Sequence, residues 1–497
     1  MSYINNIVLS MITITLFSIS FTQSIHFNLS DYKLPDLKRR SLQFNIDLSA
    51  TYDYYKIPYL DDYPPREGRY KKYLGKIFFQ YDHTVNNSEY QQQSAFRLDI
   101  DARSYPNNRT NNNLYDNSYF SPTLNYTKID RKYFGRNNFE EMNFISHYVL
   151  YLNNNSGQSV ENRQKIQILS ISIPIKRGRG RIEPVQDARH AVYLFEELSN
   201  VGRLTSDKSD EDIIEFAKLI SRLKNERFFD SRLRKIAEIE AVDSFFVSKN
   251  YVIQSDAKYF SILSDIWSYG RRPVRLSGKR ISATILPGYN LHNNLQKSNW
   301  EDYYSQNIEE KSGYITNTFT VNAGIEFNYE KPINLYWQNS IDISGYCGII
   351  DSKTKEVSHS SEMEFRAPNI LMRLHHTIGY YPNTRTYFTA SYDVQYVSFF
   401  NNPHQPDHIM GSKGNAKYEH IDLNAYYYIS PKLTLRMNAS FYYLRQHFSN
   451  GVYVYFEENP LSTTSQTSLS VNPVGQEYPF DKMTNSTISL NLNYDIF

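Results

Sequence analysis

The chain has 497 residues, of which 40% are hydrophobic and 21% charged, and its formal net charge is only +2. Because nucleic-acid binding needs a basic excess, this balance argues against such a partner. A single cysteine, Cys347, excludes an intramolecular disulfide framework and most thiolate metal sites. The chain contains 44 Tyr and 29 Phe, yet its mean hydropathy is −0.58. Such a composition suits a surface that is apolar only in narrow bands.

The N-terminus carries an apolar run from Ile7 to Phe21. Its length of about fifteen residues matches the hydrophobic region of a signal peptide and is short for a membrane span. Small residues from Ser20 to Ser24 offer a cleavage point. We therefore expect residues 1–24 to be a signal peptide; the run lacks a preceding Lys or Arg, so a retained anchor is the alternative. We expect no transmembrane helix later in the chain.

Residues 40–176 alternate apolar and polar side chains at period two, as strands with two different faces do. The strictest alternation runs from Leu42 to Tyr54, where one face is apolar and the other polar. Weaker strand candidates lie at Tyr119–Thr127 and Met142–Leu152. The polar stretch Tyr105–Asn117 predicts a solvated loop. This half of the chain is therefore predicted to be a set of antiparallel strands.

Residues 177–270 interrupt the strands, because here the apolar residues recur at the period of amphipathic helices. Four apolar stripes are predicted, beginning near Ala188, Ile213, Leu233 and Tyr259. Each stripe is narrow and the opposite faces are charged. The segment is therefore predicted to form a self-packed helical bundle that does not cross a membrane.

Local signals define the edges of these helices. Ser209 and Asp212 have the spacing of a capping box, and Gly202 can end the first helix. Glycines alternate with basic residues between Lys176 and Arg181, but the spacing of a Walker phosphate-binding loop is absent. We interpret these glycines as a hinge between the strands and the bundle.

Residues 271–497 alternate most clearly. Short turns, such as Tyr381–Asn383, are predicted to alternate with longer loops at Leu291–Lys311, Asn401–Gly414 and Asn450–Lys482. Short turns at one end and long loops at the other, with outward apolar and inward polar residues, are typical of an outer-membrane barrel. Within Glu362–Tyr380 the apolar set changes phase at Pro368-Asn369, which predicts a bulge.

The predicted fold is mainly β: a transmembrane antiparallel β-barrel of about fourteen strands, or alternatively twelve, with an inserted α-helical bundle. About eight strands follow the insertion and about six precede it. Since both numbers are even, the insertion is expected at the same end as the C-terminus, which is periplasmic in such barrels. We therefore expect the protein in the outer membrane, in contact with its lipid, with residues 177–270 in the periplasm.

The C-terminus resembles the assembly signal of bacterial outer-membrane barrels, because Ile488 to Ile496 alternate up to a terminal Phe497. The apolar set ends at Ile496, out of phase with Phe497. The resemblance implies that the barrel assembly machinery recognises the last strand. The segment Gly180–Val185 with Asp187–Arg189 resembles one found in uncharacterised outer-membrane proteins of the Bacteroidota type. That likeness implies a location in the outer membrane and brings no known activity.

Charged residues of both signs are expected on the inward face, so a strongly ion-selective pore is not indicated. They could form an ion-pair network that fills or narrows the barrel, or line a pore for small polar or amphipathic solutes. The candidate lumen-facing residues are Arg280, Glu326, Asp342, Glu364, Arg366, Arg373, Arg385, Asp393, Asp422 and Arg436.

The bundle carries mixed charges, which fit solvated helix faces with local ion pairs or a docking surface for a periplasmic partner. The candidate docking residues are Arg222, Lys224, Arg232 and Arg234. The bundle could alternatively cover the lower mouth of the barrel. The leading functional hypothesis is a solute channel, and the second is a structural or assembly protein with a plugged lumen.

An outer-membrane hydrolase is the third hypothesis, although we assign no catalytic residue, cofactor or metal. His376 should face lipid, but the residues after it lack the Ser-Asn-Gly continuation expected of membrane phospholipases. His404, Asp407 and His408 are weak candidates for metal ligands, because a fourth ligand is missing. A plain surface loop explains this cluster better.

Overall fold

The computed structural model describes most of the chain beyond the N-terminal apolar run. The described residues are 27–57, 66–110, 113–135, 137–157, 160–205, 208–225, 231–269, 274–301, 307–358, 362–400, 414–430, 433–448, 453–458, 467–472 and 482–494. The expected signal peptide, residues 1–24, and the terminal Phe497 lie outside these ranges.

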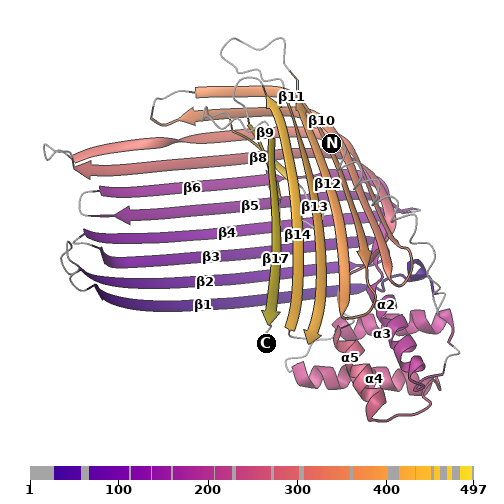
Figure 1. The fold of residues 1–497 in the computed structure, drawn as a ribbon. Helices are drawn as coiled ribbons and strands as arrows, with labels where there is room; N and C mark the ends of the chain where they lie inside the picture. Colours follow the sequence, from indigo (N-terminus) through magenta and orange to yellow (C-terminus); the bar gives the residue numbers. More distant parts are fainter. Residues whose placement is uncertain are drawn as a thin grey trace.

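One antiparallel sheet contains most of the strands (Figure 1). Its strands pair in the order β1 (Leu37–Ile57), β2 (Arg66–Asn86), β3 (Tyr90–Thr110), β4 (Asn113–Phe134), β5 (Asn138–Ser156), β6 (Val160–Ser172), β8 (Leu276–Glu301), β9 (Asn307–Pro332), β10 (Trp337–Glu356), β11 (Glu362–Tyr380), β12 (Thr386–Phe399), β13 (Gly414–Ser430), β14 (Leu433–Phe448) and β17 (Lys482–Tyr494). A separate hairpin joins β15 (Tyr453–Glu458) to β16 (Thr467–Asn472).

Strand β7 (Ile175–Pro184) lies off this path and pairs with both β5 and β8. It continues in the direction of β6, so β6 and β7 occupy one position between β5 and β8. Among the described residues, β1 and β17 end the path without pairing with each other. The expected number of about fourteen strands in a closed barrel therefore stays a prediction.

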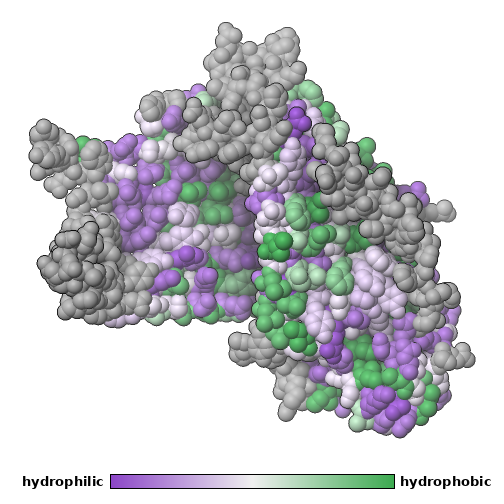
Figure 2. All heavy atoms as spheres, in the orientation of Figure 1, coloured by the Kyte–Doolittle hydropathy of each residue, from purple (hydrophilic) through white to green (hydrophobic). Residues whose placement is uncertain are grey.

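The sheet forms a β-barrel whose outer face is apolar and whose inner face is polar. On β9, Val321 and Ile325 expose 57% and 60% of their surface, whereas the residues that directly follow them, Asn322 and Glu326, expose 4% and 8%. In Figure 2, hydrophilic residues dominate the hollow beside β1–β6, and hydrophobic residues follow the outward face of β14 and β17. A water-soluble protein buries its apolar face, so this inverted pattern confirms the predicted fold class.

The apolar band is narrower than the strands are long. On β1 the exposed apolar residues extend from Leu42 to Tyr52, which matches the roughly 9–11 residues that a tilted strand needs to cross a bilayer. Strands β8 and β9 each have 26 residues and extend well past such a band. The predicted loops at Tyr105–Asn117 and Leu291–Lys311 are therefore wrong, because most residues of the first belong to β3 and β4 and most residues of the second belong to β8 and β9. Beyond the apolar band, both faces of a strand contact water. The backbone hydrogen bonds between strands continue there, but apolar side chains no longer alternate with polar ones.

The predicted bulge at Pro368-Asn369 is also wrong. The register between β10 and β11 is continuous, with Pro368 opposite Ile349. The phase change instead reflects a change in the barrel lining, because an apolar cluster replaces polar residues on the inward face. Its members, each at most 2% exposed, are Ile350, Phe365, Ala367, Val397, Phe399 and Ala416.

The glycines of β7 serve close strand pairing, and the predicted hinge is wrong. Residues 177–184, assigned to the helical insertion from the sequence, belong to β7. A Cβ added at Gly178 would lie 2.2 Å from the carbonyl oxygen of Ile281 on β8, and one at Gly180 would lie 2.0 Å from that of Lys279. Gly180 also has a φ of 114°, which only glycine adopts readily. These glycines let β7 lie against β8.

Replacing Gly180 by alanine is expected to lower the free energy of unfolding by about 1–3 kcal/mol, because the new Cβ meets backbone and the φ angle becomes strained. The measurement is urea unfolding of the detergent-solubilised barrel. Gly345→Ala is the matched control, since nothing lies within 4 Å of its added Cβ. Equal stability of the two variants would contradict the close-packing account.

The helical insertion consists of α2 (Gln186–Asn200), α3 (Asp210–Asn225), α4 (Ser231–Ser248) and α5 (Ala257–Tyr269). Its core is aromatic: the ring of Phe195 lies 5.6 Å from that of Phe216 and 5.2 Å from that of Phe246. Edge-to-face pairs at these distances stabilise a small core beyond its apolar burial. Among the described residues, no helix is both long and apolar enough to cross a membrane.

The predicted helix ends are confirmed. The backbone N–H of Asp212 donates to the hydroxyl of Ser209 at 3.1 Å, and Gly202, with a φ of 67°, follows the end of α2. Hydrogen bonds from Lys249, Tyr251 and Ser209 lower the pKa of Asp212 to about 2. These local contacts therefore define where α2 ends and where α3 begins.

The domain packs on the turns at one end of the barrel (Figure 1). The hydroxyl of Tyr193 donates to the carbonyl of Tyr381 in the β11–β12 turn at 2.9 Å. Leu335 of the β9–β10 turn and Tyr32 from the N-terminal segment join the helical core. Helix α2 is consequently buried on most of its surface, so the prediction of one narrow stripe is wrong for this helix. The short β9–β10 and β11–β12 turns thus lie at the same end as the insertion.

Candidate functional site in the barrel interior

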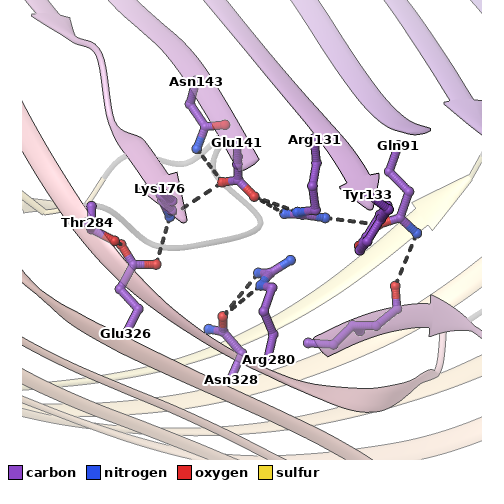
Figure 3. A network of polar contacts seen from close by, with 11 residues as sticks. Gln91, Arg131, Tyr133, Glu141, Asn143, Lys176, Arg280, Thr284, Glu326 and Asn328 are labelled. Atoms are coloured by element: carbon purple, nitrogen blue, oxygen red, sulfur yellow. Dashed lines mark hydrogen bonds and ion pairs between the residues drawn. The ribbon is translucent and has the colours of Figure 1, made fainter. Parts of the chain in front are cut away.

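A buried chain of alternating charges connects β4, β5, β7 and β9 (Figure 3). Arg131 donates to Glu141 at 2.6 Å. The ammonium of Lys176 lies 3.6 Å from Glu141 and 2.7 Å from Glu326. All four residues are at most 8% exposed. Removing either sign would leave a buried charge unpaired, so the arrangement holds β7 tightly between its neighbours.

Neutral side chains complete the hydrogen bonding of this chain. Glu326 accepts from the hydroxyls of Thr284 at 3.0 Å and Tyr346 at 2.7 Å. Asn143 donates to Glu141 at 2.8 Å. Because both carboxylates accept several hydrogen bonds, much of the free-energy cost of removing their charges from water is offset. We call Arg131, Glu141, Lys176 and Glu326 with these three partners the buried charge network.

Further polar residues lie beside the buried charge network. Arg280 donates to the amide oxygen of Asn328 at 3.0 Å, and Asn328 donates to Asp342 at 2.5 Å. Gln91 accepts from Arg131 at 3.0 Å, and its own amide donates to the carbonyl of Ile182 at 3.4 Å. The end of β7 therefore reaches residues of β3 (Figure 3). Side chains of strands from β3 to β10 thus contact one another in the interior near the helical end.

A second polar cluster lines β11 and β12. Arg373 donates to Asp393 at 2.9 Å, and the same carboxylate lies 3.2 Å from Nδ1 of His375. The other ring nitrogen of His375 lies 3.0 Å from the hydroxyl of Thr377, which lies 2.9 Å from that of Ser391. Carboxylate, imidazole and hydroxyl thus form one hydrogen-bonded row along the inner wall.

A groove of about 550 Å³ follows the inner face of β13, β14 and β17. Asn438 donates to Asp422 at 2.9 Å, and His420 lies 2.9 Å from the hydroxyl of Ser440. We call this the lumenal groove. Its lining is Tyr418, His420, Asp422, Arg436, Asn438, Ser440, Tyr442, Ser489 and Asn491.

Seven of the ten predicted lumen-facing residues lie on the inner face. They are Arg280, Glu326, Asp342, Arg373, Asp393, Asp422 and Arg436. Glu364 and Arg366 do not, because the continuous register across Pro368 turns them outward, where Glu364 pairs with Lys353. Arg385 lies in the β11–β12 turn and pairs with Asp265 of α5. These three assignments are corrected.

Sequence reasoning missed several interior residues. Lys176 lay in the segment interpreted as a hinge, and Glu141 lay at the edge of a weak strand candidate. The Tyr and Asn residues of the lumenal groove carry no charge, whereas the predicted lumen-facing residues are all charged. On β13 and β14 these residues lie an even number of positions from Asp422 and Arg436, and therefore on the same face. The alternation in the sequence could thus have identified them.

The predicted docking residues differ in what they contact. Arg222 is exposed on α3. Lys224 pairs with Asp187 at 2.7 Å, and Arg234 pairs with Glu238 at 2.7 Å, so both belong to local ion pairs. Arg232 lies in α4, and its side chain is outside the described residues.

The candidate metal ligands and the candidate hydrolase histidine differ in whether the structure describes them. His404, Asp407 and His408 lie outside the described residues, and within the described part no group of three or more His, Cys, Asp or Glu side chains could hold a metal. His376 contacts Asn339 at 2.8 Å, and Ile341 and Tyr392 lie opposite it on the two neighbouring strands. A serine nucleophile is absent from both of these opposite positions.

The fold and its interior define a β-barrel with an apolar outer face, a polar and partly filled interior, and a helical domain on its turns. No protein-family model matches the chain, and no curated protein matches it significantly. Similar solved structures include the toluene transporter TodX of P. putida, at 8% identity and a TM-score of 0.23, covering 83% of this chain and 84% of that one.

A Pseudomonas aeruginosa FadL homologue is also similar, at 8% identity and a TM-score of 0.25, and the match covers 93% of this chain and 91% of that one. A TodX mutant described as a monoaromatic hydrocarbon channel matches at 10% identity and a TM-score of 0.23, with 84% and 87% covered. With TM-scores this low, the barrel assignment rests on the strand pairing and facing of this chain itself.

Proposed function

We propose that this protein is an outer-membrane channel for small polar or amphipathic solutes, with its helical domain in the periplasm. The observation that carries the proposal is the inverted facing of the strands: apolar side chains point outward and polar side chains line the interior. Only an apolar solvent around the barrel favours this arrangement. Outer-membrane lipid is therefore the medium that its outer face contacts.

The accessible part of the interior favours polar solutes. The apolar cluster of Ile350 and Phe365 is at most 1% exposed at these two residues, so it offers little surface to a solute. The lumenal groove, by contrast, presents hydrogen-bonding groups along β13, β14 and β17. A pathway along this wall would exchange a solute's water contacts for protein hydrogen bonds.

The periplasmic position of the helical domain rests on its place beside the short turns, which face the periplasm in bacterial barrels. There it could dock a protein partner through exposed residues such as Arg222 or cover the mouth of the barrel. For the last strand, whose described part ends at Tyr494, we propose recognition by the barrel assembly machinery.

A second candidate is a structural or assembly protein with a plugged lumen, and the buried charge network favours it. The four charged residues of this network, each at most 8% exposed, occupy part of the interior near the helical end. The two candidates differ in whether a continuous path remains beside the network, along the lumenal groove.

Conductance in planar bilayers is the test. The channel proposal expects discrete current steps from the purified full-length protein, with both cations and anions carried, since interior charges of both signs occur. A variant lacking residues 186–268 would show whether the helical domain restricts the current. The absence of current from both proteins would overturn the channel proposal and favour the plugged barrel.

A further inference from the structure

The lumenal groove contains a cation that differs from two of the other inward-facing arginines. Arg131 is paired with Glu141 and Arg373 with Asp393. Arg436 is exposed and stacks over the ring of Tyr426 at 5.1 Å. Within the described part of the chain, no carboxylate forms an ion pair with it. A guanidinium with its fork free presents two parallel donors that match a carboxylate.

Next to this cation the groove offers directed hydrogen bonds of both kinds. Asp422 contributes acceptors, Asn438 contributes its amide oxygen as an acceptor, and Ser440 and Ser489 contribute hydroxyls that both donate and accept. A ligand that satisfies such a surface must itself carry several groups that donate and accept. Polyhydroxylated molecules have this property, and apolar molecules would leave these groups without partners.

Tyrosine rings border the same hydrogen-bonding strip. The ring of Tyr418 lies 6.1 Å from that of Tyr442, and the ring of Tyr426 stacks at 4.3 Å on that of Tyr387. A tyrosine presents an apolar face to one part of a ligand and a hydroxyl to another. Sugar rings combine a C–H face, which packs on an aromatic ring, with a rim of hydroxyls, which reach Asp422 and Asn438.

We propose that the lumenal groove binds a sugar-like, polyhydroxylated solute that carries a carboxylate, with the carboxylate at Arg436. The volume of about 550 Å³ lies within the range typical of small-molecule sites and accommodates one or two sugar rings. This inference rests on the proposed function in that the groove lines the pathway of the solute, and it names the class of that solute.

The test is calorimetric titration of the detergent-solubilised full-length protein with glucuronate. Glucose, which lacks the carboxylate, and acetate, which lacks the ring, are the matched ligands. Glucuronate is expected to bind more tightly than either. Arg436→Gln is expected to weaken glucuronate roughly tenfold, because one charge-assisted pair is lost, and to leave glucose unchanged. Tyr418→Leu is expected to weaken glucuronate and glucose alike.

Arg445→Gln is the control variant, because Arg445 lies on β14 with parity opposite to that of Arg436 and faces outward. It should bind glucuronate as the wild type does. Absence of glucuronate binding, or equal binding by Arg436→Gln and wild type, would overturn the inference. The titration needs no conduction: binding without bilayer current would overturn only the channel proposal, and current without binding would overturn only the sugar-acid site.

Discussion

Replacing Lys176 by methionine is expected to lower the free energy of unfolding of the barrel by about 3–5 kcal/mol. The side chains of Lys176 and Glu141 are 5% and 2% exposed, and that of Glu326 is 11% exposed. Methionine fills a similar volume but carries no charge, so Glu326 loses its ion pair while it remains buried. Urea unfolding in detergent, followed by tryptophan fluorescence, measures the change.

Two further variants separate this effect from a general intolerance of substitutions. Lys353→Met removes the cation that pairs with Glu364, but the Lys353 side chain is 53% exposed, so the loss should stay below about 1 kcal/mol. Adding Glu326→Gln to Lys176→Met should recover part of the lost stability, because it removes the unpaired charge. If Lys176→Met behaved like Lys353→Met, the interior near β7 would have to be hydrated.

The alternation of side chains was sufficient to predict the barrel and the face on which most interior residues lie. Val321 and Asn322 illustrate why: in a strand, adjacent residues must point to opposite faces, so their polarity reports which face meets the apolar medium. Strand parity similarly predicted that the insertion lies at the same end of the barrel as the C-terminus. Both inferences need only the local pattern and the antiparallel rule.

The failed predictions concern features that depend on neighbours distant in sequence. Glu364 and Arg366 were assigned inward because an apolar phase change was interpreted as a bulge, whereas Phe365 packs inside the barrel against Phe399 with ring centroids 5.7 Å apart. Gly180 was interpreted as a hinge because nothing local reveals that the backbone of Lys279 lies against it. The periodicity of a sequence shows which residues share a face of a strand. It does not show which distant residues that face contacts.

Arg275→Met is expected to loosen the helical domain from the barrel. Arg275 is 1% exposed and immediately precedes β8. Its guanidinium donates to the carbonyls of Asn334 and Trp337 at 2.7 Å each, to the side chain of Gln338 at 3.2 Å, and to the carbonyl of Leu335. One side chain thus satisfies several acceptors of the β9–β10 turn, and its loss leaves them buried without donors at a cost of about 3 kcal/mol.

Hydrogen–deuterium exchange distinguishes local loosening from global unfolding. A local cost of about 3 kcal/mol corresponds to roughly hundredfold faster exchange in α2 and α5, while β1–β3 should keep their protection. Arg222→Met, at an exposed position of α3, is the matched control and should exchange as the wild type does. Unchanged protection of α2 in Arg275→Met would mean that Tyr193 and the Arg385–Asp265 pair hold the domain without it. Faster exchange confined to α2 and α5 would identify Arg275 as the residue that couples the helical domain to the barrel turns.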